Sequence, residues 1–209
     1  MLDLIILAVI TFLIVRKLKS ILGKEGDDMY FYCYATKQQK DIKEAEQVNK
    51  NEDTYNCLEH LTQEAKDNAK IIYSKIENFT LSKFQKIATK VLECVIKANN
   101  EHNKTDIKKF FSTELAESIC KTFENNETSN IILVSYKDVK ITDIFKKNNI
   151  FSIKIMFNME QINYTTDKNN NIIDGSKNEI INVKEVWTFV HDFSKKNNVW
   201  LISNIEELS

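Results

Sequence analysis

The spacing of apolar residues changes from a helical period to a strand period near residue 128. In TLSKFQKIATKVLECVIKANN, residues 80–100, the apolar side chains recur every three or four positions and lie on one face of a helix. They are Leu81, Phe84, Ile87, Ala88, Val91, Leu92, Val95 and Ala98. In NIFSIKIMFNM, residues 149–159, the odd positions from Phe151 to Met159 are all apolar, which is typical of a half-buried strand. Helices followed by strands predict an α+β fold with helices packed on a curved antiparallel sheet.

Weaker patterns complete this prediction. Residues 55–78 resemble an amphipathic helix, Thr105 is expected to cap a short turn, and Ser112 is expected to begin another helix. Further strands are expected at residues 131–141, 180–193 and 198–205. Two polar links separate the later strands: DKNNNIIDGSKNE, whose Asp174-Gly175 pair is a turn signal, and SKKNN.

The first 22 residues, MLDLIILAVITFLIVRKLKSIL, predict a retained membrane anchor. Fifteen helical residues reach only about 22 Å against a hydrocarbon core of about 30 Å, but continuing to Leu22 gives about 33 Å if the lysines snorkel. A cleaved signal would place its cations first and small residues after the apolar run, and an interfacial helix would carry a wide polar face. Here Arg16, Lys17, Lys19 and Lys24 follow the run, so we expect the amino terminus outside and residues 24–209 in the cytoplasm.

These features divide the chain into three parts. Residues 1–22 are the predicted anchor, residues 23–77 a charged linker ending in an amphipathic helix, and residues 78–209 the folded domain. The linker contains an aromatic run at residues 30–34, which either touches lipid headgroups or forms a local cluster within the linker. The expected location is a bacterial inner membrane, crossed once.

Charge and motifs argue against several function classes. The net charge of −1 gives no electrostatic reason to expect nucleic acid as a partner. The four cysteines show no C-x-x-C spacing, and Cys57 with His60 alone makes a weak metal site, so we predict neither metal nor cofactor. No phosphate loop, nucleotide fingerprint or catalytic histidine motif is present. The sequence therefore favours a protein that is not an enzyme.

Two groups of residues are candidate binding surfaces. The first consists of bulky apolar residues on the predicted strands, which either line a groove for an acyl chain or a partner's apolar segment, or simply form the core. These are Ile155, Phe157, Trp187, Phe189 and Trp200. The second is a stripe of four lysines on the outer side of the helix at residues 80–100, which either faces an anionic membrane or is a solvated face. These are Lys83, Lys86, Lys90 and Lys97.

Three stretches carry a family resemblance: FSTELAESI after Asp106, EVWTFVHDF, and NNVWLISNI. Over residues 78–209 the chain resembles the carboxy-terminal domain of the Tim44-like family, with an anchor and linker similar to those of its alphaproteobacterial membrane-anchored branch. The acidic-x-Trp-Thr-Phe strand of that family is matched by residues 185–189. His191 stands where the family usually has arginine, and Asn197-Asn198 replaces a proline, which puts an anion-binding role of that strand in doubt.

The resemblance implies a cone of the nuclear-transport-factor-2-like kind with an apolar groove. It also implies partners: mitochondrial members associate with inner-membrane lipid, especially cardiolipin, and with the import machinery, and a separate amino-terminal region recruits a chaperone of the DnaK type. Chaperone recruitment is the weakest of these expectations here, because only residues 23–54 lie between the predicted anchor and the first predicted helix.

We therefore expect a non-enzymatic adaptor anchored in the inner membrane. Its groove would bind membrane lipid, a membrane-protein partner or a translocation client. The alternative is a structural component of a secretion-type membrane complex with the same fold, whose domain would lie outside the cytoplasm.

Overall fold

The computed structural model describes residues 58–125, 127–195 and 199–208. The predicted anchor at residues 1–22 and the aromatic run at residues 30–34 lie outside these residues, as does Cys57. Within the described part, no helix combines the length and hydropathy needed to cross a membrane. All the described residues belong to one compact unit.

Four helices come first among the described residues. They are α3 (Gln63–Lys75), α4 (Leu81–Asn100), α5 (Lys104–Phe110) and α6 (Thr113–Thr122). Five strands follow them: β1 (Glu127–Lys147), β2 (Ile150–Asp167), β3 (Ile172–Gly175), β4 (Ile181–Asp192) and β5 (Leu201–Glu207). The predicted order, helices before strands, is confirmed.

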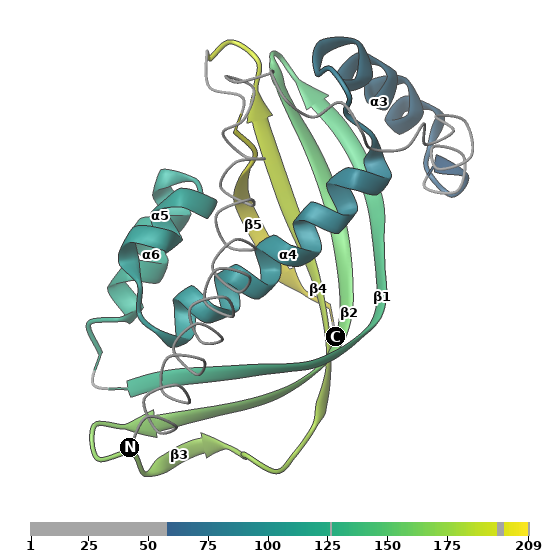
Figure 1. The fold of residues 1–209 in the computed structure, drawn as a ribbon. Helices are drawn as coiled ribbons and strands as arrows, with labels where there is room; N and C mark the ends of the chain where they lie inside the picture. Colours follow the sequence, from purple (N-terminus) through teal and green to yellow (C-terminus); the bar gives the residue numbers. More distant parts are fainter. Residues whose placement is uncertain (1–57, 126, 196–198, 209) are drawn as a thin grey trace, which may run out of the picture. The chain divides into compact units, whose positions relative to one another are not determined.

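All the strand pairs are antiparallel, in the order β1-β2-β4-β5, with β3 added to the far end of β2. Figure 1 shows the sheet bending strongly, with β1 and β2 continuing past β4 and β5 toward β3. Three register shifts interrupt the β1–β2 pairing, and such bulges bend a strand. The predicted curved antiparallel sheet is therefore confirmed. We call its extension, residues 127–134, 161–167 and 172–175, the arm.

The core lies between the sheet and α4, which crosses in front of the strands in Figure 1. The odd positions of β2 predicted to be apolar, from Phe151 to Met159, are all buried. Seven of the eight predicted apolar positions of α4 are buried, and Ile87 is partly exposed. The two periodicities thus identify two surfaces that pack against each other.

Helix caps explain where α4 and α5 begin. The hydroxyl of Thr80 accepts a hydrogen bond from the amide of Lys83, as an N-cap should. The expected cap at Thr105 is wrong, because the Asn103 side chain accepts the Asp106 amide instead and places Thr105 inside α5. Ser112 precedes α6 as predicted, although its amide donates to the carbonyl of Ile202 and ties this turn to β5.

Side chains of the helices cap the outer edge of β1. Four donors from the α3 and α4 region reach its carbonyls: His60 to Ile141 at 2.5 Å, Asn68 to Ile144, Gln85 to Val139 and Asn100 to Ile131. The helix that we assigned to the end of the linker, residues 55–78, therefore packs on the sheet at its observed position α3. The division of the chain at residues 22 and 77 stays a prediction.

The link at residues 167–179 is not wholly a loop, because it contains β3. The turn comes earlier: the Asp167 carboxylate accepts the amides of Asn169 and Asn171, and Asn170 has a φ of 63°. Gly175 ends β3 with a φ of 72°, and a Cβ there would lie 2.3 Å from the Asn163 carbonyl oxygen. The Asp-Gly pair thus marks a close approach of β3 to β2 instead of the predicted turn.

Candidate functional site

The predicted groove residues lie on the face of the sheet that α4 covers. Ile155 and Phe157 are completely buried, and Trp187 and Phe189 are 3% exposed. Trp200, just before β5, is half-buried. Phe84 of α4 packs over them, with its ring centroid 5.5 Å from that of Phe189 and 4.9 Å from that of Trp200. Four of the five residues thus contribute to the core, and binding by them stays a prediction that requires α4 to move.

Glu185 is the acidic group on this face. The indole Nε1 of Trp187 donates to its carboxylate at 2.8 Å, and Glu207 stands opposite it on β5. Burial raises the pKa of Glu185, and the negative charge of Glu207 raises it further, although the Trp187 hydrogen bond acts the other way. The family-like Glu-x-Trp pair therefore places a carboxyl that readily takes up a proton beside the apolar core.

His191 lies on the same face, near the end of β4. It is 1% exposed, and its ring lies 4.3 Å from that of Phe193 and 5.2 Å from that of Trp200, between centroids. Asp192 belongs to the opposite face and accepts from Ser194, so the two neighbours do not form a catalytic dyad. The alternation of the strand puts His191 on the same face as Trp187 and Phe189, and the structure shows that this face is buried as far as His191.

The four predicted lysines form an exposed stripe on α4. Lys83, Lys86, Lys90 and Lys97 are all exposed, opposite the buried apolar face of the helix. Lys97 makes a loose ion pair with Glu101 at 4.0 Å. Among the described residues, Lys83, Lys86 and Lys90 have no acidic side chain within ion-pair distance. Because the positive charges of these lysines are not neutralised by nearby carboxylates of the described residues, the stripe can attract anions.

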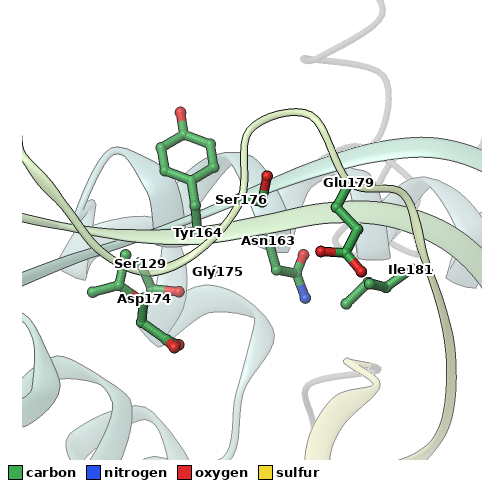
Figure 2. Close-up of a pocket in the computed structure, with 9 residues that line it drawn as sticks. Ser129, Asn163, Tyr164, Asp174, Gly175, Ser176, Glu179 and Ile181 are labelled. Atoms are coloured by element: carbon green, nitrogen blue, oxygen red, sulfur yellow. The ribbon is translucent and has the colours of Figure 1, made fainter.

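The sequence did not reveal a shallow hollow on the arm. Its volume is about 380 Å³, and its lining residues include Ser129, Asn163, Thr165, Asp174 and Glu179. Figure 2 shows Tyr164 pointing away from Asn163 and Asp174, as neighbouring strand residues do. The only signal in the sequence was Asp174-Gly175, because Gly175 lets β3 approach β2 and form one wall.

The arm also exposes aliphatic side chains. Ile132 on β1 is 47% exposed, and Ile173 on β3 is 51% exposed. Ile172 of β3 is similarly exposed, and so is Ile180, which lies outside the arm just before β4. Sequence patterns missed this surface because the residues lie in segments that break the strict alternation of a strand.

The described residues contain no group of three or more histidine, cysteine or acidic side chains that could hold a metal ion. Cys94 on α4 is half-buried, and burial raises the pKa of its thiol. A thiol with a raised pKa stays protonated at neutral pH and is a poor nucleophile. Within the described part of the chain, the arrangement offers binding surfaces, with charge on α4 and apolar side chains on the arm.

Comparisons with known proteins place the chain in a family. The intermembrane-space region of the chloroplast protein ARC6 is similar in structure, with 10% identity, 60% of this chain and 96% of that chain covered, and a TM-score of 0.40. A nuclear transport factor 2-like superfamily protein from Salmonella enterica gives 11% identity, 62% and 93% coverage, and a TM-score of 0.38. No curated protein sequence matches. The model of the Tim44-like domain matches residues 67–207, which include α4 to α6 and the whole sheet, and the chain therefore belongs to the Tim44-like family.

Proposed function

We propose that this chain is a non-enzymatic adaptor of the inner membrane. Residues 1–22 would anchor it, and the domain at residues 78–209 would lie on the cytoplasmic side. There the domain would bind membrane lipid, a membrane-protein partner or a translocation client. The observation that supports this proposal best is the exposed stripe of Lys83, Lys86, Lys90 and Lys97 on a helix of a Tim44-like domain.

Electrostatics explains how the stripe would act. Each lysine close to an anionic leaflet contributes about 1 kcal/mol to binding, and this attraction fades within a Debye length. Four lysines alone therefore give weak binding that salt disrupts. An anchor would make weak binding sufficient, because it confines the domain near the surface and raises its local concentration.

The stripe also fits the packing of α4. Its apolar face is buried against the sheet, so the lysine face is the side that a flat surface can reach. The apolar groove stays part of the proposal, but it requires a movement of α4. A client's apolar segment would reach Phe189 and Trp200 only when Phe84, which covers them, is displaced.

Binding of the anchorless chain to vesicles tests the proposal. A chain lacking residues 1–22 should sediment with vesicles that contain an anionic phospholipid and not with neutral vesicles, and sodium chloride should weaken this. Changing Lys83, Lys86 and Lys90 to Gln should lower the binding constant for these vesicles at least tenfold, because the three charges together contribute about 3 kcal/mol, equivalent to roughly 150-fold.

The matched control removes the same charge elsewhere. Lys108, Lys121 and Lys184 are also exposed but lie on α5, α6 and β4. Their triple Gln variant should retain most of the binding. If both variants lose binding equally, only net charge matters and the α4 stripe has no special role; if neither does, the domain does not bind lipid through this helix.

A further inference from the structure

The buried imidazole of His191 has no hydrogen-bond partner among the described residues. Both ring nitrogens, Nδ1 and Nε2, are buried and unpaired there, and the residue is 1% exposed. A neutral imidazole normally donates through one nitrogen and accepts through the other. Leaving both unpaired in an apolar environment costs free energy that the surrounding packing must offset.

Aromatic rings from β2, from the turn after β4 and from the segment before β5 surround this imidazole. Phe151 of β2 is its cross-strand partner, Phe193 follows β4, and Trp200 precedes β5. The ring of Phe193 also lies edge-on to that of Phe151, with centroids 5.1 Å apart. We call these four residues, His191, Phe151, Phe193 and Trp200, the His191 cluster. Trp200 in turn stacks on Phe79, between α3 and α4, at 6.2 Å.

Two lysines lie over rings of the His191 cluster, so they disfavour a positive charge on the imidazole. Lys75 of α3 lies 5.2 Å from the centre of the Phe193 ring, and Lys146 of β1 lies 5.4 Å from that of Phe151. The nearest carboxylate in sequence, Asp192, lies on the other face with Lys195 at 3.6 Å. Tyr73, the titratable ring of α3 in this region, packs on Phe79.

The burial of His191 determines how the stability of the fold changes with pH. Burial lowers the pKa of His191, and Asp192 offsets this only in part. An unfolded histidine takes up a proton near pH 6.5, whereas the folded chain resists it until lower pH. Stability contributed by the neutral imidazole is therefore present above about pH 6.5 and is lost as the pH falls below that value.

We propose that His191 is an acid-sensitive latch. Uptake of one proton by its imidazole opens the corner where α3, the end of β4 and the start of β5 meet, and exposes the rings of Trp200 and Phe79 to solvent. This inference does not depend on membrane binding or on the adaptor function. Opening of the latch creates an exposed aromatic surface, which exists only at acidic pH.

Urea unfolding of the full chain in detergent, followed between pH 7.5 and 5, tests the latch. The unfolding equilibrium constant should rise by up to about tenfold per pH unit below pH 6.5, as expected for one proton. In His191→Gln, which cannot take up this proton, that rise should be absent. Most carboxylates titrate below this range, so they contribute little to the difference between the two curves.

The control is His102→Asn, because His102 has a φ of 50° that Asn tolerates and lies against Phe123 away from the cluster. This variant should keep the pH dependence of the original chain. In a Trp187→Phe background, acrylamide should quench Trp200 at least twofold more strongly at pH 5.5 than at pH 7.5, and adding His191→Gln should abolish this change.

Parallel curves for the original chain and His191→Gln would overturn the latch. Should His191→Gln fail to fold, the three histidine rings can be titrated by NMR in the original chain, with His191 identified by elimination through His60→Gln and His102→Asn. The latch predicts that the His191 ring stays neutral below pH 6 until Trp200 becomes exposed. A His191 ring that titrates near pH 6.5 without any change at Trp200 would contradict it.

Discussion

At the scale of single residues, Gly175 decides whether the arm can form. Its φ of 72° lies in the left-handed region, and a Cβ would meet the backbone of Asn163 and Tyr164 at 2.3 and 2.9 Å. Both neighbours are backbone atoms of β2, so they cannot move aside as the end of a side chain could. The glycine is therefore required by the approach of β3 to β2.

We expect Gly175→Ala to destabilise the domain by about 2 kcal/mol or more, because it adds this clash to the left-handed penalty of about 1–2 kcal/mol. Urea unfolding monitored by circular dichroism measures the loss. Asn170→Gly is the control: its φ of 63° is also left-handed but needs no close approach, so that variant should be neutral or slightly stabilised. Equal stability of Gly175→Ala and the original chain would refute this account of the arm.

Residue patterns predicted some positions well and others poorly. Thr80 was identified as a cap because a hydroxyl before an apolar helical run has one local role. The rings that enclose His191 could not be predicted, because they include Trp200 from the segment before β5 and Phe193 from the turn after β4. A sequence shows which residues share a face but not which rings from distant segments close over them.

At the scale of elements, amide side chains of the helices connect α4 to the edge of β1. Asn100 makes two hydrogen bonds to Ile131: its Nδ2 donates to the carbonyl at 2.7 Å, and its Oδ1 accepts the amide at 3.0 Å. It therefore pairs with the strand edge as another strand would. Such pairing also covers an edge that would otherwise invite association with another chain.

Replacing Asn100 by Ala should cost about 1–3 kcal/mol, because two hydrogen bonds are lost and the Ile131 groups must pair with water. Hydrogen exchange of the Ile131 amide should become at least tenfold faster. The neighbouring change Asn99→Ala serves as the control and should leave that amide protected. Unchanged exchange in Asn100→Ala would show that the strand edge is protected without the amide pairing.

The element types were predictable where one period continues without interruption, as in α4 and the first half of β2. The full length of β1 was not, because its three register shifts break the alternation on which a strand is recognised. β3 was missed for a related reason: its four residues are all exposed, so no buried face marks it. The hollow on the arm depends on both features and could not be predicted.

At the scale of the whole molecule, binding by the lysine stripe depends on which side of the membrane the domain occupies. The stripe lies on the exposed side of α4, and the cations that follow the apolar leader predict that the domain carrying it lies on the cytoplasmic side. The alternative, a component of a secretion-type complex, would place the same domain outside the cytoplasm. The side of the membrane on which the domain lies therefore distinguishes the adaptor from the secretion-type component.

Protease protection in spheroplasts of a bacterium that produces the full chain measures this orientation most directly. With protease added outside, the account predicts that the domain at residues 78–209 survives intact and is digested only after the membrane is opened with detergent. A periplasmic marker protein digested in the same sample shows that the protease was active. Digestion of the domain in intact spheroplasts would contradict the adaptor topology and favour the secretion-type alternative.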